Sequence, residues 1–362
     1  MNIDEKIALV TRNTQEVINE DELKQLFEEK LIPKAYIGFE ISGFLHIGHF
    51  IVAQKLKDLR DAGFEVDVFL ADWHSMINNK LSGNLDTIQK VGREYFKSAF
   101  EAAGVTGERI NFRWSSELTS KSDYWKRVIE IAKNTTLTRM TRCLPIMGRV
   151  EDIKTEMETA FLFYPPMQCA DIFELDVDLA AGGMDQRRIH MLAREIAPKI
   201  KAKKPIVLHT PLLMGLSGPG GRMDHSAVDE DGGGLHEAKM SKSDPNSAIF
   251  THDSPQDIKN KLKKAHCPAK EVENNPVLDL ARLVHFPYLG KLTIKRKPKF
   301  GGDIEFNNIE ELKTAFTAGE LHPLDLKFAM ADSLAELMKP TREYFEKYPE
   351  KLELMQKYKV TK

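Results

Sequence analysis

The sequence has few cysteines, no long apolar run and almost no net charge. Its three cysteines, Cys143, Cys169 and Cys267, are far apart and show no CxxC spacing. A disulfide framework and a structural zinc site are therefore not expected. No apolar run approaches the length needed to cross a membrane, and the charged N-terminal segment lacks the apolar core of a signal peptide. We expect a cytoplasmic protein.

The overall charge points to no particular partner. The 362 residues include 52 lysines and arginines and 54 aspartates and glutamates, a formal net charge of −2. Global basicity typical of a nucleic-acid-binding protein is absent, although a local basic cluster can exist within a balanced total. With 42% hydrophobic and 29% charged residues, the composition is that of a globular protein with a substantial core. At this length two domains are expected.

The N-terminal part of the chain has the pattern of a strand, a helix and a second strand. Residues 35–39 are apolar like a buried strand, a helical pattern starts at Leu45 and stops at Gly63, and residues 64–74 alternate as a strand does. This βαβ pattern predicts a parallel sheet with right-handed crossovers. Further strands are expected at 108–117, 176–183 and 204–216, and helices at 84–103, 122–143 and 185–199.

The composition changes near residue 250. Residues 217–238 are rich in Gly, Asp and Glu and predict a mobile loop. Ser254 is then a candidate N-cap, with Pro255 at the first helical position. We expect an α/β domain with a Rossmann-like parallel sheet over residues 1–250 and a helical domain over residues 251–362. The tail beyond about residue 340 has no motif and is expected to be a solvated helix.

Two histidines lie at the first strand-to-helix turn, where His46 and His49 flank Gly48. The N-terminus of a helix presents free N–H groups and the positive end of the helix dipole to an anion. Both imidazoles can donate to phosphate oxygens, and Gly48 would let a flat base approach the backbone. Taken alone, a pair of surface histidines is an equally good interpretation. A zinc site is a weaker one, because no cysteine or third histidine lies at ligand spacing.

Two lysines and two serines follow the Gly-rich segment, in the order Lys239-Met240-Ser241-Lys242-Ser243. Ammonium and hydroxyl groups on a mobile segment suit a polyphosphate whose charge must be met as it reacts. Alone, this segment would be interpreted as a solvated loop. Its combination with the histidine turn favours nucleotide chemistry. The glycine fingerprint of an NAD-binding dehydrogenase is absent.

HIGH followed by KMSKS, one α/β domain apart, resembles the signature pair of the class I aminoacyl-tRNA synthetases. Similarity to the archaeal and eukaryotic tyrosyl enzymes extends over about residues 10–340 and includes YIGFEISGFLHIGH, ADWH, YPPMQCADI, AAGGMDQRRIHMLARE and FGGD…ELHPLDLK. The resemblance implies a catalytic first domain, an anticodon-binding second domain and a homodimer. It implies that L-tyrosine is activated with ATP, which Mg²⁺ accompanies, and is then transferred to tRNA(Tyr).

The resemblance also implies a tyrosine pocket. Tyr36 and Asp171 would contact the substrate phenol, since a buried phenol needs an acceptor for its proton and a donor for its oxygen. Three further residues would hold the amino end and the ring: Tyr164, Gln168 and Gln186.

For ATP, the resemblance implies that His46, Gly48 and His49 contact the nucleotide and that Gly183 and Asp185 contact the ribose. Lys239 and Lys242 would hold the β- and γ-phosphates of the leaving pyrophosphate. No side chain is expected to act as a covalent nucleophile, because positioning and charge neutralisation supply the rate.

For tRNA, the resemblance implies that Arg142 and Arg187 meet the first base pair of the acceptor stem. Phe300, His322 and Asp325 match the anticodon contacts: Phe300 would stack on an unpaired base and Asp325 would accept from a guanine edge. Each arginine taken singly is equally typical of a solvated helix face.

Two alternatives remain at this point. A tryptophanyl-tRNA synthetase is the nearest enzyme, but an indole N–H is only a donor, which argues against it beside Asp171 and Tyr36. A catalytically silent, RNA-binding paralogue is the alternative from another class, and the intact HIGH and KMSKS segments argue against it.

Overall fold

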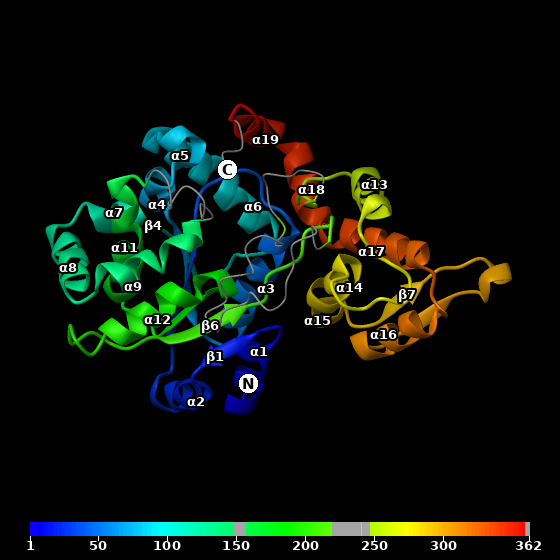
Figure 1. Ribbon diagram of the computed structural model, residues 1–362, viewed down its shortest axis with the longest axis horizontal. Coiled ribbons are helices and arrows are strands. Elements are labelled where there is room, and N and C mark those ends of the chain that lie inside the picture. Colours follow the sequence, from blue (N-terminus) through cyan, green and yellow to red (C-terminus); the bar gives the residue numbers. More distant parts are fainter. Residues whose placement is uncertain (148–156, 219–239, 241–246, 359–362) are drawn as a thin grey trace.

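The computed structural model describes residues 1–147, 157–218, 240 and 247–358. A larger lobe, which we refer to as the first lobe, is built on a six-stranded sheet, and residues 255–337 form a smaller second lobe (Figure 1). The sheet has the order β1-β6-β5-β2-β3-β4; β1 pairs antiparallel with β6, and the other neighbours pair in parallel. The strands are β1 (Glu16–Ile18), β2 (Lys34–Phe39), β3 (Glu65–Leu70), β4 (Ile110–Trp114), β5 (Leu179–Gly183) and β6 (Ile206–Thr210).

The mixed α/β fold with its mostly parallel sheet confirms the predicted class, and each of the five predicted strands overlaps an observed strand. Strand β1 was not predicted. It has only three residues, all of them partly buried, so it shows neither an apolar run nor an inside–outside alternation.

Alternate residues of the strands face two separate cores. Ala35, Ile37 and Phe39 of β2 belong to one core, whereas Tyr36 belongs to the other. The first core is covered by α1 (Ile3–Thr11), α2 (Glu20–Glu29), α3 (Ile47–Asp61), α5 (Leu85–Val91) and α6 (Lys97–Ala102). The second is covered by α4 (Asp72–Ile77), α7 (Ser115–Thr119), α8 (Ser122–Lys133), α11 (Tyr164–Glu174) and α12 (Arg187–Ile196). The sheet is therefore packed on both sides, as parallel sheets require.

The prediction of one continuous helix over residues 122–143 is wrong. The structure has α8 and a separate short helix, α9 (Leu137–Thr141). Thr136 has an extended backbone, and its hydroxyl accepts a hydrogen bond from the backbone N of Arg139, so it caps a new helix. A threonine inside a helical pattern carried the signal for this break.

The second lobe begins as the sequence predicts. Ser254 caps α13 (Pro255–Lys264) by accepting from the backbone N of Asp257, and Ile258 and Leu262 are buried. Beside helices, this lobe contains an antiparallel hairpin that the sequence did not reveal. Its remaining elements are α14 (Pro276–Leu280), α15 (Phe286–Leu289), β7 (Leu292–Ile294), β8 (Ile304–Phe306), α16 (Ile309–Ala318) and α17 (Pro323–Leu337).

The tail is not a solvated helix. It forms α18 (Lys339–Lys347) and α19 (Pro349–Gln356), which return to the first lobe beside α6 (Figure 1). Phe345 stacks on Tyr95 with ring centroids 5.3 Å apart, and Leu354 and Met355 are buried in the first core. The division of the chain at residue 250 stays a prediction, but packing assigns these last helices to the first lobe.

Helix α3 joins the two lobes. Its residues Ile47, Phe50 and Ile51 are buried in the core of the second lobe, whereas Leu56 and Leu59 are buried in the first. A helix that is apolar on two faces in this way is buried by packing on both sides. The lobes therefore share one helix.

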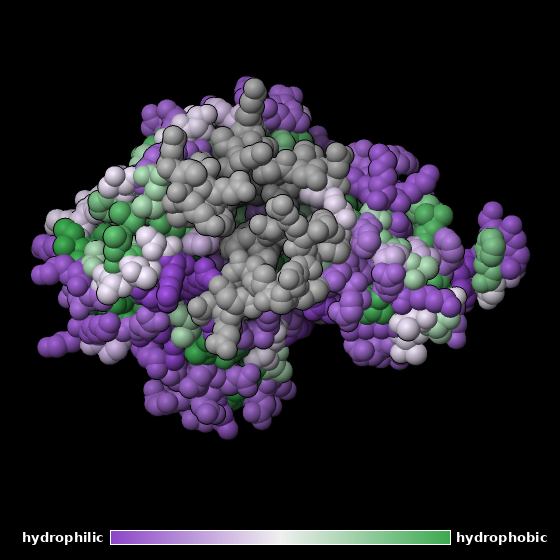
Figure 2. Space-filling view, viewed as in Figure 1, coloured by the Kyte–Doolittle hydropathy of each residue, from purple (hydrophilic) through white to green (hydrophobic). Residues whose placement is uncertain are grey.

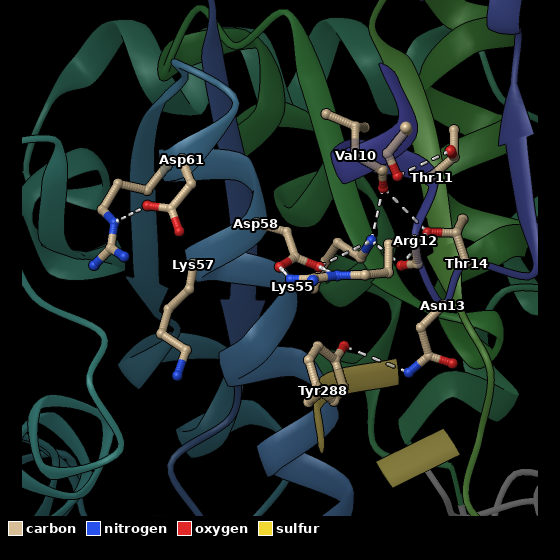
Figure 3. Close-up of polar contacts among 12 residues, drawn as sticks. Val10, Thr11, Arg12, Asn13, Thr14, Lys55, Lys57, Asp58, Asp61 and Tyr288 are labelled. Atoms are coloured by element: carbon tan, nitrogen blue, oxygen red, sulfur yellow. Dashed lines mark hydrogen bonds and ion pairs between the residues drawn. The ribbon is translucent and has the colours of Figure 1, made fainter. Parts of the chain in front are cut away.

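A buried polar cluster lies on α3 at this junction (Figure 3). Lys55 is fully buried, and its Nζ donates to the backbone oxygens of Val10 at 2.6 Å and Arg12 at 2.5 Å. Arg12 pairs with Asp58 of α3, and its guanidinium lies 5.1 Å from the ring centroid of Tyr288 in the second lobe. The segment after α1 is thereby held against α3 and the second lobe together.

The lysine at the centre of this cluster predicts a pH-dependent stability. Burial lowers the pKa of Lys55 to about 8, whereas a lysine in an unfolded chain has a pKa of about 10.4. Between these values the unfolded chain binds more protons than the native protein, so stability rises with pH. We expect the free energy of unfolding of the parent, relative to Lys55→Met, to rise by about 2–3 kcal/mol between pH 7 and pH 10. Urea denaturation of both proteins at each pH measures this difference. A difference that stays constant over the range would contradict a charged, desolvated Lys55.

Candidate active site

The chain reverses its direction across the sheet between β2 and β5. From β2 it continues to β3 and β4 on one side, and then returns to β5 and β6 on the other side. In open α/β sheets, ligands bind at the carboxyl ends of the strands at such a point. Strand β2 ends at Phe39, shortly before the HIGH turn, and β5 ends at Gly183, directly before Asp185 and Gln186. Two predicted site segments therefore leave the sheet at the same place.

The HIGH turn forms the N-terminus of α3, as predicted. His46 is the N-cap, and its Nδ1 accepts from the backbone N of Gly48 at 3.1 Å. His49 Nδ1 in turn accepts from the backbone N of His46 at 3.3 Å, and the two ring centroids lie 4.2 Å apart. Because each Nδ1 accepts, each neutral ring carries its proton on Nε2, which suits a donor toward phosphate.

Gly48 is required by the close approach of the His46 ring. A Cβ at this position would lie 2.8 Å from Cε1 and 2.9 Å from Nδ1 of His46. Any side chain here would displace the ring that caps the helix. The glycine between the two histidines therefore preserves the geometry of the turn.

The chain beyond β6 returns to the HIGH turn. Ile47 N donates to the Ile249 oxygen at 2.8 Å, and Met240, which is buried, donates from its N to the Leu213 oxygen at 2.7 Å. Met240 and Ile47 belong to the same core. The predicted phosphate ligands Lys239 and Lys242 and the predicted mobile loop 217–238, apart from residues 217 and 218, lie outside the described residues.

Tyr36 and Asp171 lie in the core beneath this edge of the sheet. They come from β2 and α11, and their exposed fractions are 2% and 1%. Burial raises the pKa of Tyr36 well above its ordinary value, and the nearby Asp171 carboxylate raises it further. Tyr36 therefore remains a neutral hydroxyl that can both donate and accept.

The two carboxylate oxygens of Asp171 have different surroundings. Tyr124 of α8 donates its hydroxyl to Oδ1 at 2.8 Å, whereas Oδ2 has no hydrogen-bond partner among the described residues. His74 Nε2 lies 3.3 Å from Oδ2, but the two atoms are not aligned for a hydrogen bond. Burial raises the pKa of Asp171, and the Tyr124 hydrogen bond opposes this shift. Sequence reasoning assigned no role to Tyr124 or His74.

A second polar group lies at the carboxyl end of β2. Tyr164 donates to Glu40 Oε1 at 2.9 Å, and Asn78 Nδ2 donates to the same oxygen at 2.7 Å. Gln168, one turn after Tyr164 on α11, donates to Gln186 at 2.9 Å. The structure thus pairs Gln168 with Gln186 and adds Glu40 beside Tyr164. Glu40 Oε2 lies 3.8 Å from Lys80 Nζ, and its carboxylate is an anion suited to a substrate ammonium group. Its place directly after a strand, at the sheet edge, was a signal available in the sequence.

The glycines after β5 let two side chains fold back onto the strand end. A Cβ on Gly182 would lie 2.7 Å from Gln186 Cγ, and one on Gly183 would lie 2.6 Å from Asp185 Oδ1. The predicted ribose contacts Gly183 and Asp185 are therefore adjacent, within a short turn that also carries Gln186.

The two predicted basic segments lie side by side. Arg139 Nη2 donates to the Arg188 backbone oxygen at 3.2 Å, and Arg188 Nη1 donates to the Arg142 backbone oxygen at 3.2 Å. Arg187 pairs with Glu16 of β1 at 2.6 Å. The segments of the predicted acceptor-stem residues Arg142 and Arg187 thus meet near the N-terminus of α12.

The remaining predicted tRNA residues lie in the second lobe, away from the HIGH turn (Figure 1). Phe300 is 57% exposed between β7 and β8, and Lys299 Nζ lies 4.9 Å from its ring centroid. His322 is the N-cap of α17, its Nδ1 accepting from the backbone N of Leu324, and Asp325 lies in the first turn of that helix. An exposed aromatic ring and a helix N-terminus with a carboxylate are thus available on this lobe.

Among the described residues, no three His, Cys, Asp or Glu side chains are grouped so that they could hold a metal ion. The described part of the chain also contains no helix with the length and apolarity to cross a membrane.

The fold and the site define a class of protein. The model of the family "tRNA synthetases class I (W and Y)" matches residues 29–339, and the chain belongs to this family. The tryptophanyl-tRNA synthetase of Aeropyrum pernix shares the fold, with a TM-score of 0.68 at 18% identity over 94% of this chain and 84% of that one.

Similarity to tyrosyl enzymes is much higher. A tyrosine–tRNA ligase of Sulfolobus acidocaldarius is 49% identical over 94% of each chain. The structure of a tyrosyl-tRNA synthetase from Pyrococcus horikoshii complexed with L-tyrosine superposes with a TM-score of 0.92, at 44% identity, over 99% of this chain and all of that chain.

Proposed function

We infer that this chain is a tyrosine–tRNA ligase. It activates L-tyrosine with ATP to tyrosyl-adenylate and pyrophosphate, and then transfers the tyrosine to the 3′ end of tRNA(Tyr). The observation that carries this inference is the buried pair of Asp171 and Tyr36 at the switch point of the sheet. A hydroxyl acceptor beside a hydroxyl that can donate is the pairing a phenol needs, and an indole N–H would use only half of it.

Activation proceeds by in-line attack of the tyrosine carboxylate on the α-phosphorus of ATP, with pyrophosphate as the leaving group. The proposed role of His46 and His49 is to donate from Nε2 to the phosphates as charge develops, which the accepting Nδ1 atoms support. Lys239 and Lys242 meet the β- and γ-phosphates, and Mg²⁺ enters with ATP as part of the substrate. Gly183 and Asp185 contact the ribose.

The amino acid is oriented by its two polar ends. The phenol meets Asp171 and Tyr36, while Tyr164, Gln168 and Gln186 hold the ring and the ammonium group. Glu40 extends this proposal, because it accepts from Tyr164 at 2.9 Å and supplies the negative charge that an ammonium group needs. Such positioning at both ends brings the carboxylate to the phosphorus without a covalent enzyme intermediate.

In the second step the 3′-terminal hydroxyl of tRNA displaces AMP. Arg142 and Arg187 are proposed to receive the acceptor stem. In the second lobe, Phe300 stacks on an anticodon base, and Asp325 with His322 reads a base edge. The 57% exposure of Phe300 supports the stacking role, because recognition of single-stranded RNA relies on accessible aromatic faces.

The functional form is proposed to be a cytoplasmic homodimer. Figure 2 shows apolar residues gathered over the region of α8 and α11. Ile129 of α8, Leu137 of α9 and Phe163, which directly precedes α11, are exposed by 58%, 66% and 47%. Large exposed apolar side chains on one face are typical of a protein–protein interface. A second copy of this chain, meeting the same face by two-fold symmetry, would cover them.

Pyrophosphate exchange with each of the twenty amino acids tests the proposed activity. We expect ATP-dependent exchange with tyrosine and, with phenylalanine, exchange lower by roughly 10⁴-fold or more, because the analogue leaves buried polar groups unpaired; a tyrosyl-tRNA synthetase is the source of that magnitude. Preference for tryptophan would favour the sister enzyme. Absence of exchange with every amino acid would favour a silent RNA-binding paralogue.

The assignment of the second lobe predicts a separation of the two reaction steps. Asp325 lies in α17, whereas the HIGH turn lies in the first lobe, so Asp325→Ala should lower kcat/KM for tRNA charging by about tenfold or more and leave pyrophosphate exchange unchanged. Aminoacylation and exchange, measured on the same preparation, provide the comparison. Asp332→Ala, farther along α17, serves as the matched control. Parallel losses in both assays for Asp325→Ala would assign it to the fold instead of to RNA.

A further inference from the structure

His74 and Asp171 form a buried pair in which three polar atoms, both ring nitrogens of His74 and Oδ2 of Asp171, have no hydrogen-bond partner among the described residues. His74 is 1% exposed, and neither of its ring nitrogens has a hydrogen-bond partner among the described residues. Oδ2 of Asp171 is equally buried and equally without a partner, and it lies 3.3 Å from His74 Nε2. Buried polar groups are rarely left in this state, since each costs about 1–3 kcal/mol. Two of them 3.3 Å apart in the core indicate a ligand group that satisfies both.

The surroundings hold this pair in place. Tyr124 donates to the other oxygen of Asp171, Oδ1, at 2.8 Å and so fixes the carboxyl group with Oδ2 toward His74. The His74 ring packs edge-on against Tyr164, with centroids 4.8 Å apart at an interplanar angle of 87°. Neither side chain therefore turns freely to find another partner. Both side chains therefore have this arrangement in the absence of the substrate.

The chemistry of the pair selects a hydroxyl. Burial lowers the pKa of His74 to about 4, so the ring is neutral at neutral pH and has one donor and one acceptor nitrogen. Its charged and titratable neighbours are Asp72 on the same helix and Asp171 and Tyr164 on α11. Tyr124 on α8 and Tyr36 on β2 lie near Asp171. A single hydroxyl can donate to one member of the pair and accept from the other, whereas a hydrogen or methyl group can do neither.

We propose that His74 is a direct contact of the substrate's phenolic hydroxyl, which bridges His74 Nε2 and Asp171 Oδ2, and that Tyr124 is the positioning residue that holds Asp171 for this contact. The proposal rests on the proposed tyrosine pocket and deepens it. Selection against phenylalanine then depends on three elements outside the HIGH and KMSKS segments: α4, α8 and α11.

The test compares pyrophosphate exchange with tyrosine and with phenylalanine in single variants. His74→Leu removes both ring nitrogens at similar volume, and Tyr124→Phe removes only the hydroxyl. Each should lower kcat/KM for tyrosine on the order of tenfold or more, mainly through KM, leave KM for ATP unchanged and leave exchange with phenylalanine equal or higher. His74→Gln, which restores a donor and an acceptor, should recover part of the loss.

Two controls separate the possible results. Tyr288→Phe removes the hydroxyl of a partly buried tyrosine, which Asn13 approaches at 3.4 Å, and should leave the preference for tyrosine unchanged. Asp171→Asn should abolish the preference. The proposal is overturned if Asp171→Asn abolishes the preference while His74→Leu and Tyr124→Phe keep the parent's tyrosine-to-phenylalanine ratio within twofold. It is also overturned if these two variants lose exchange with both amino acids equally. In either case His74 and Tyr124 have only structural roles. If Asp171→Asn also keeps the ratio, the proposed tyrosine pocket itself is wrong.

Discussion

The half-satisfied carboxyl group of Asp171 is the constraint around which the first lobe is arranged. A carboxyl group that is 1% exposed must receive hydrogen bonds, yet the described residues supply one, from Tyr124 to Oδ1, and none to Oδ2, which we propose to be met by the ligand. A buried oxygen without a hydrogen bond destabilises the native state, so it persists only in rigid surroundings. The second core provides them between the sheet and α4, α8 and α11. The proposed substrate selection by Asp171 thus depends on a buried oxygen that the described residues leave without a hydrogen bond.

Helix α3 relates this core to the rest of the molecule. Its N-terminus carries the histidine turn, its middle carries Lys55 and Asp58, and its first two turns are buried in the core of the second lobe. Arg12 and Tyr288 add a contact between the segment after α1 and the second lobe (Figure 3). Any change in the position of the second lobe therefore bears on the helix that begins at the proposed phosphate site.

The sequence predicts the parts of this structure that local patterns determine. The βαβ unit, the histidine turn at the start of α3 and the cap of α13 at Ser254 each follow from residues within a few positions of one another. The contacts that complete the proposed tyrosine pocket do not. Tyr124 and Asp171 are 47 residues apart, and on its own helix Tyr124 has the spacing of an ordinary core aromatic. Strand β1 and the packing of α18 and α19 likewise depend on tertiary contacts, which no periodicity encodes.

A crystal structure of the complex with L-tyrosine tests the central claim most directly. The account predicts that the phenolic oxygen lies within about 3 Å of Asp171 Oδ2 and of His74 Nε2, with Tyr124 still donating to Oδ1. The amino end should lie beside Glu40 and Gln168. A bound tyrosine whose hydroxyl points away from Asp171, or whose ammonium group occupies the space between Asp171 and His74, would contradict it.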